Sequence, residues 1–134
     1  MSITRRFTKE GIPVIVFNTP IIDAAISVYG AHLLYWKPKK EKESIIYLSK
    51  LAKFTRGIPI CWPWFGTAGT PRHGYGRRSD WTENVSEIMD DGSVHAKFTL
   101  TLPKPIDVEG TVDFHINETQ LTQSITTTNN RETE

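Results

Sequence analysis

The chain has 134 residues, the length of a single domain, and its 16 basic and 15 acidic residues are mixed along it and leave a net charge of +1. It therefore lacks the one-sided basic field of a nucleic-acid binder. One cysteine excludes an internal disulfide and a cysteine-built zinc cage, and no apolar run approaches the length of a membrane span. These features predict a cytoplasmic protein without a nucleic-acid or membrane partner.

Periodicity predicts short strands in the first part of the chain. They cover residues 12–17, 21–28, 31–36 and 45–48. The charged run at 37–43 is expected to be a solvated hairpin tip, because acidic residues interrupt its basic ones. Residues 49–54 are the only stretch in which we expect a helical turn.

The segment 56–77 reads RGIPICWPWFGTAGTPRHGYGR, and its prolines and glycines predict a shaped loop rather than regular structure. It combines aromatic side chains with cationic and imidazole groups: Trp62, Trp64, Phe65 and Tyr75, with Arg72, His73, Arg77 and Arg78. Aromatic faces accept the C–H surface of a pyranose, and guanidinium groups match phosphate bidentately. The loop therefore predicts a site for a sugar or a phosphosugar.

Alternation of apolar and polar residues predicts strands after the loop. It is strict at 94–102 and returns at 112–116, and a turn at 90–92 makes a hairpin of 81–89 with 94–102. Residues 121–128 are threonine-rich, which suits an exposed strand. Without any long 3.6-residue stripe, this pattern predicts an all-β fold, an antiparallel β-sandwich whose alternating apolar residues face the core.

The chain runs off its last predicted strand into TNNRETE without a closing strand. A sandwich that stops there leaves an edge or a face uncovered, so we expect that the chain could associate through this sheet.

Other single residues have plain interpretations. His95 and His115 occupy polar positions of alternating strands and are expected to be simply exposed. No metal site is expected, because none of the four histidines lie at paired ligand spacing. Cys61 is expected to be a buried, inert thiol, and His32 to have a structural or supporting role. Considered only as a lone histidine in a Gly- and Pro-rich loop, His73 would be expected to be a surface residue.

Three motifs together resemble the glucose-6-phosphate 1-epimerase (hexose-6-phosphate mutarotase) branch of the aldose 1-epimerase-like superfamily. They are GAHLLYW at 30–36 followed by YLSKLAKF at 47–54, GIPICWPWFG at 57–66, and HGYGR at 73–77 with Trp81 four residues on. The resemblance runs from about residue 11 to 130 and covers the first half of the family's length.

This resemblance implies a galactose-mutarotase-like β-supersandwich, of which residues 1–134 are the amino-terminal portion of one domain, and an isomerase that interconverts the anomers of glucose 6-phosphate without a cofactor. It places His73 and Arg77 at the sugar and phosphate site, in a motif where Tyr75 replaces a phenylalanine. Trp64 and Tyr75 are further expected substrate contacts. Arg56 is displaced by one place from the family's RGGIP arginine, and we keep it as a candidate phosphate ligand.

The family's catalytic glutamate base and histidine acid fall beyond the point that corresponds to Glu134, so no catalytic residue is assigned here. Asp80 is the carboxylate nearest to HGYGR in sequence, but a base must lie within about 3 Å of the hydroxyl that it deprotonates. The isolated chain is therefore expected to be almost inactive. The alternative is a noncatalytic phosphosugar-binding β-module that keeps the arginine and histidine side of the site.

Overall fold

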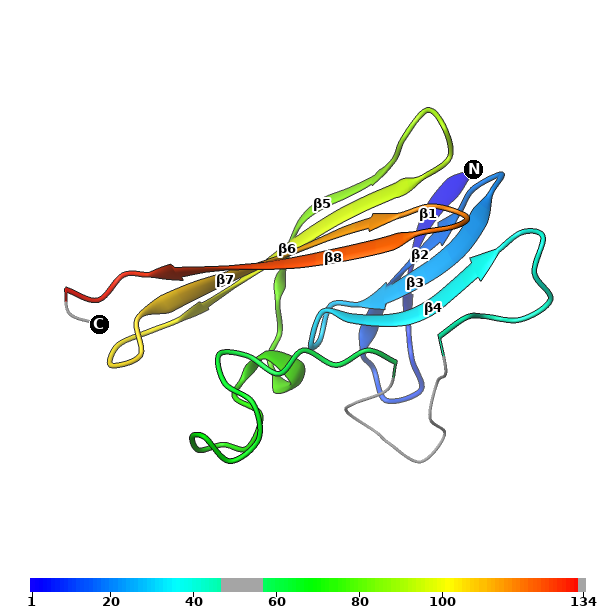
Figure 1. Ribbon diagram of the computed structural model, residues 1–134. Coiled ribbons are helices and arrows are strands. Elements are labelled where there is room, and N and C mark those ends of the chain that lie inside the picture. The colour runs from blue at the N-terminus through cyan, green and yellow to red at the C-terminus, as the bar shows by residue number, and fades with distance from the viewer. Residues whose placement is uncertain (47–56, 133–134) are drawn as a thin grey trace.

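The structure, a computed structural model, describes residues 1–46 and 57–132, and they form two antiparallel sheets (Figure 1). The first sheet has the order β1-β2-β3-β4 and the second the order β5-β6-β7-β8. The strands are β1 (Ser2–Phe7), β2 (Pro13–Asn18), β3 (Ile22–Ser27), β4 (His32–Pro38), β5 (Thr82–Ile88), β6 (Val94–Leu102), β7 (Val108–Ile116) and β8 (Leu121–Asn129). The prediction of an all-β antiparallel sandwich is confirmed.

The core lies between the sheets, on the faces that the alternation predicted. Val94, Ala96 and Phe98 of β6 are almost fully buried, and so are Val112, Phe114 and Ile116 of β7. Antiparallel pairing places Phe98 opposite Val112 and Ala96 opposite Phe114, so both strands present the same face. The first sheet adds mainly aliphatic side chains and Phe17: Ile15, Phe17, Ile22, Ala24, Ile26 and Leu33. The two alternating strands thus form one wall of a single hydrophobic core.

Three local expectations differ from the structure. Strand β1 was not expected, because SITRRF is polar and mostly exposed, and it forms by backbone pairing to β2 rather than by burial. The prediction of a strand at 45–48 is wrong for residues 45 and 46, which are bends, and residues 47 and 48 lie outside the described ranges. Strand β4 extends two residues beyond its predicted end, to Pro38. The charged run at 37–43 ends β4 and then forms an exposed turn, after which the Ile45 amide donates to the Trp36 carbonyl at 2.8 Å, but residues 45 and 46 are not a second strand. The helical turn expected at 49–54 lies outside the described residues.

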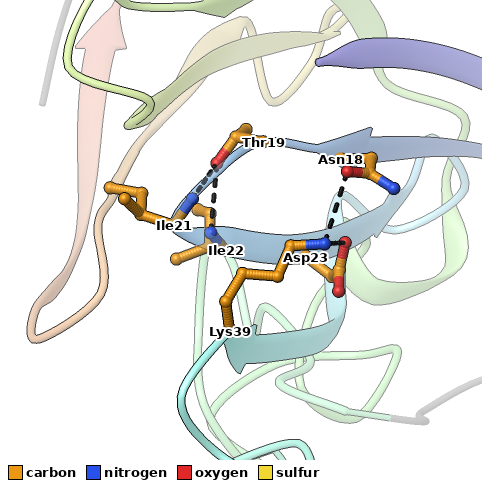
Figure 2. Close-up of polar contacts among 6 residues, drawn as sticks. All are labelled: Asn18, Thr19, Ile21, Ile22, Asp23 and Lys39. Carbon is orange, nitrogen blue, oxygen red and sulfur yellow. Dashed lines mark hydrogen bonds and ion pairs between the residues drawn. The ribbon is translucent and has the colours of Figure 1, made fainter.

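A buried threonine shapes the turn between β2 and β3 (Figure 2). Thr19 Oγ1 accepts hydrogen bonds from the amides of Ile21 and Ile22, at 3.2 and 3.1 Å. The hydroxyl satisfies backbone donors that the tight turn leaves unpaired. Lys39, just after β4, donates to Asp23 Oδ1 of β3 at 2.9 Å and so ties the end of one strand to its neighbour.

Strand β8 lies at the edge of its sheet among the described strands, and most of its side chains are exposed. The expectation of an uncovered sheet rests on this edge, and association through it stays a prediction. No helix in the described ranges is long and apolar enough to cross a membrane.

Candidate functional site

The loop between β4 and β5, described from residue 57 onward, is fixed at both ends to the β3–β4 hairpin. At its start, the amide of Ile58 donates to the Leu33 carbonyl at 3.1 Å. At its end, the amide of Gly30 donates to the Ser79 carbonyl at 2.7 Å. Figure 1 shows the loop, in green, below the two sheets. Its polar groups are therefore held by the rigid sandwich rather than by a free tether.

Backbone hydrogen bonds join the CWPW and HGYGR motifs. The carbonyl of Trp62 accepts from the amides of Tyr75 and Gly76, at 2.8 and 2.9 Å. Gly74 lies between His73 and Tyr75 and has a φ of +71°. A Cβ at this position would lie 2.2 Å from the Trp62 carbonyl oxygen. Only glycine fits this approach without strain. The two motifs therefore form one structural unit, although eleven residues lie between their first residues, Cys61 and His73.

Two buried tryptophans anchor this unit to the sandwich. Trp62 donates its indole N–H to Thr127 Oγ1 of β8 at 2.9 Å, and its ring lies over Gly110 of β7. Trp81 packs against Trp62, with ring centroids 5.9 Å apart, and donates to the Gly76 carbonyl at 2.8 Å. Both indoles have partners for their N–H groups and are buried, so they support the loop rather than contact a ligand.

The imidazole of His73 is oriented by Gly66. The Gly66 amide donates to His73 Nδ1 at 2.8 Å, and the His73 amide donates to the Gly66 carbonyl at 2.8 Å. Because an amide can only donate, Nδ1 keeps its lone pair and the neutral ring carries its proton on Nε2. The pKa of His73 lies below its ordinary value, because desolvation and the charges of Arg72 and Arg77 disfavour the imidazolium. At neutral pH His73 therefore offers an N–H donor and no free basic nitrogen.

Arg77 lies on the short 3₁₀ turn η1 (Gly76–Arg78) and is partly buried. Its Nη2 donates to the Arg72 carbonyl at 3.2 Å, which aims the guanidinium back across the loop. Its Nε is buried and has no hydrogen-bond partner among the described residues. A buried donor of a charged group that lacks a partner is costly, and an anionic ligand would relieve that cost.

His32 lies close to this arginine. Its side chain is 3% exposed, and burial, with the charge of Arg77, lowers its pKa to about 4. A Cβ on Gly30 would lie 2.5 Å from His32 Nε2 and 2.8 Å from the Arg77 carbonyl oxygen, so glycine gives the imidazole its space. His32 Nε2 also lacks a partner in the described part of the chain. A neutral imidazole beside Arg77 avoids placing a second charge next to the guanidinium.

The aromatic residues of the loop have different roles. Trp64 donates its indole N–H to the Pro71 carbonyl at 2.7 Å and packs edge-on against Tyr75, with ring centroids 5.6 Å apart. These contacts give Trp64 and Tyr75 a part in shaping the loop. Phe65 is 74% exposed and lies 4.8 Å from the His73 ring. Of these three rings, Phe65 offers the open face beside the polar groups.

Four of the five residues that the sequence selected for the site, namely His73, Arg77, Trp64 and Tyr75, thus lie in one folded unit. The fifth, Arg56, lies outside the described residues. Sequence reasoning did not select His32 or the exposed Phe65 for the site. For Phe65 the signal was its place in the aromatic run at 62–65, in the same loop as His73, but neither its exposure nor its contact with His73 could be deduced from the sequence.

The carboxylates near the loop have other partners. Burial alone would raise the pKa of Glu83, but hydrogen bonds from Ser86 and Arg5 and the charge of Arg5 outweigh it and lower that pKa. Glu83 is therefore held as a paired carboxylate, which makes it a poor general base. Asp80 is exposed, and its backbone bridges to Tyr29.

Two expectations for single residues need correction. Cys61 is partly exposed rather than buried, because Ile60 and Trp62 on either side point into the core and direct Cys61 outward. His95 is not simply exposed, since its side chain is 19% exposed and its ring nitrogens lie 2.8 Å from Glu87 Oε1 and 3.0 Å from Asp113 Oδ1. Linear spacing could not show this contact, because it arises from strand pairing.

Residues 13–134 match the aldose 1-epimerase family. Two curated relatives carry the name "Putative glucose-6-phosphate 1-epimerase". The protein of Escherichia coli (strain K12) is 39% identical over 108 residues, which is 74% of this chain and 36% of that protein. The protein of Salmonella typhimurium (strain LT2) is 38% identical over 92 residues, 62% of this chain and 31% of that protein. The aligned part of the chain thus spans about a third of the length of these relatives.

Solved structures give the same result for the fold. A crystal structure described as a putative mutarotase (YeaD) from Salmonella typhimurium superposes with a TM-score of 0.74 at 32% identity, over 86% of this chain and 43% of that one. The crystal structure of HI1317 superposes with a TM-score of 0.78 at 26% identity, over 98% of this chain and 53% of that one. The sandwich of this chain is therefore a mutarotase fold, as its motifs predicted.

Proposed function

Because the chain belongs to the aldose 1-epimerase family, we propose that its loop at residues 57–81 binds a hexose 6-phosphate, and that the protein interconverts the α and β anomers of that sugar. Glucose 6-phosphate is the substrate that we favour, since the relatives from Escherichia coli and Salmonella typhimurium carry it in their names.

The observation that carries the proposal is the partnerless, buried Nε of Arg77. One hydrogen bond to the Arg72 carbonyl orients the guanidinium, and a phosphate oxygen would supply the acceptor that Nε lacks. The neutral His73 adds an N–H donor from the same loop, and the exposed ring of Phe65 adds an apolar face. Donors for an anion and a face for a pyranose ring thus lie within one rigid unit.

Anomer exchange also needs a base for the anomeric hydroxyl and an acid for the ring oxygen, so that the ring can open, rotate and close again. His73 is unsuited as the base, because its Nδ1 lone pair already accepts from Gly66 and its Nε2 carries the proton. We propose that the acid and the base come from the part of the relatives that this chain does not match, which is more than half of their length. In this proposal residues 1–134 supply substrate binding.

Substitution of Arg77 tests the binding proposal. Arg77→Ala should weaken glucose 6-phosphate binding about tenfold or more, since a hydrogen bond to a charged group contributes roughly 1.5–3 kcal/mol, and should leave the weaker binding of glucose almost unchanged. Arg77→Lys keeps the charge but loses the planar fork, so it should recover only part of the affinity. Calorimetric titration with both sugars measures these affinities.

Arg6→Ala on β1 is the matched control, because it removes an exposed arginine and the same charge elsewhere in the chain. Equal losses for glucose and glucose 6-phosphate in Arg77→Ala would show that Arg77 holds the loop rather than the phosphate. A noncatalytic phosphosugar-binding module remains the alternative function. It predicts the same binding but no anomer exchange in any longer form of the protein.

A further inference from the structure

The outer face of the second sheet gathers a group of side chains that the sugar loop does not use. His95 on β6 and His115 on β7 are direct cross-strand partners, and their rings stack with centroids 4.4 Å apart. Asp113 lies two residues before His115 on the same face. Possible ligand atoms of these three residues all lie within 4.8 Å of one another. The histidines are twenty residues apart in the printed sequence, and strand register brings them together.

A cation would improve the contacts around Asp113. Nε2 of His95 and Nε2 of His115 each lie 3.0 Å from the same oxygen, Asp113 Oδ1. His95 Nδ1 lies 2.8 Å from Glu87 Oε1. Carboxylate oxygens only accept hydrogen bonds, and a neutral His95 has one N–H, so it can donate to Glu87 or to Asp113 but not to both. The lone pair of its other nitrogen then faces a lone pair of the remaining carboxylate oxygen. A bound proton or a metal ion removes this repulsion.

We propose that His95, Asp113 and His115 bind a divalent cation of the Zn²⁺ class. A tetrahedral zinc ion with bonds of about 2.0–2.1 Å holds its ligand atoms about 3.3 Å apart. The two nitrogen–oxygen distances of 3.0 Å are close to that value. The rings of His95 and His115 are stacked only 11° from parallel, so one ring must turn before both nitrogens point at the same ion. Two imidazoles with one carboxylate favour zinc, copper or nickel over magnesium or calcium.

Glu87 supports the site from β5. It is the cross-strand partner of His95, and its carboxylate accepts from Nδ1 of that ring. Metal-binding histidines in proteins usually donate their second N–H to a carboxylate in this way, which fixes the tautomer and leaves the other nitrogen for the metal. With Nδ1–H given to Glu87, the lone pair of His95 lies on Nε2, the nitrogen that faces Asp113.

The proposed site is open to solvent, since the His115 side chain is 60% exposed. Three protein ligands leave a fourth position for water or an external ligand. Lys97 is a competing cation on this face, since the register places it opposite Asp113. The site is separate from the sugar loop. His115 lies five residues along β7 from Gly110, which contacts Trp62, and this is about 17 Å at the rise of a strand.

Titration of Zn²⁺ into the tag-free, chelator-treated chain tests the proposal by calorimetry. We expect one saturable site and a Zn²⁺-dependent rise in the melting temperature, because the ion joins β6 to β7. His115→Gln should lower the affinity at least tenfold, and Glu87→Gln should lower it about 10- to 100-fold by freeing the His95 ring. His73→Gln removes a histidine from the sugar loop and should leave both stoichiometry and affinity unchanged.

A second readout separates coordination from nonspecific binding. In imidazole NMR spectra, Zn²⁺ should shift the Nε2 resonances of His95 and His115 and leave His73 in place. Circular dichroism confirms that each variant is folded. The proposal is overturned if the chain shows no saturable site, or if Zn²⁺ binds a folded His95→Gln/His115→Gln double variant as tightly as the original chain.

Discussion

The buried histidine beside Arg77 should make the stability of the chain depend on pH. His32 has a pKa of about 4 in the folded protein, against an ordinary value of 6.5 that applies when the chain unfolds. Between these values the unfolded chain binds the proton and the folded chain does not, so acidification favours unfolding. The contribution of His32 is therefore complete above pH 6.5 and is lost as the pH falls from 6.5 towards 4.

The two pKa values give the size of the effect. They imply that the free energy of unfolding falls by about 2 kcal/mol at pH 5 and about 3 kcal/mol at pH 4 from this histidine alone. Urea denaturation, followed by the fluorescence of the buried Trp62 and Trp81, measures the free energy of unfolding at each pH.

The variant His32→Gln keeps a polar side chain but cannot take up the proton. Its unfolding free energy should decline less steeply between pH 7 and pH 5, and its difference from the original chain should change by about 2 kcal/mol over that range. The pKa of His73 is also lowered, so His73→Gln is the matched control, and its effect should be smaller because the ring is more exposed. Parallel pH curves for the original chain and His32→Gln would refute the reasoning.

Three further predictions concern the loop and the activity. Gly74→Ala should destabilise the chain by at least about 2 kcal/mol, because it adds a clash with the Trp62 carbonyl to the cost of about 1–2 kcal/mol for a positive φ. Gly66→Ala is the control, because Gly66 also has a positive φ, +62°, but no atom lies within 4 Å of an added Cβ. Urea denaturation of Gly66→Ala should therefore show the backbone cost alone. Thr127→Val should cost about 1 kcal/mol by removing the acceptor of the Trp62 indole, whereas Thr126→Val should cost less, and equal losses would contradict that role. Residues 1–134 alone should show almost no anomer exchange of glucose 6-phosphate by NMR, and addition of the segment that the relatives possess beyond the matched region should restore it; rapid exchange by the isolated chain would place an acid and a base within it.

Much of the fold could be predicted from local pattern. Alternation at 94–102 and 112–116 identified the two strands whose inward residues form one wall of the core, because a strand's period of two fixes which side chains share a face. The same alternation could not find β1, which is polar and exists because β2 offers an unpaired edge. Strand bounds next to the loop likewise depended on backbone pairing rather than on composition.

The candidate site, like the fold, was predicted from the sequence only in part. Its composition and motifs selected His73 and Arg77, because residue types for phosphate and sugar recognition can be listed from sequence alone. The tertiary structure decided the rest: the Gly66 amide fixes the tautomer of His73, the fold buries the Arg77 Nε without a partner, and burial beside Arg77 keeps His32 neutral. The pairing of His95 with His115 was also hidden, since a sheet joins residues by register and sequence spacing carries no information about it.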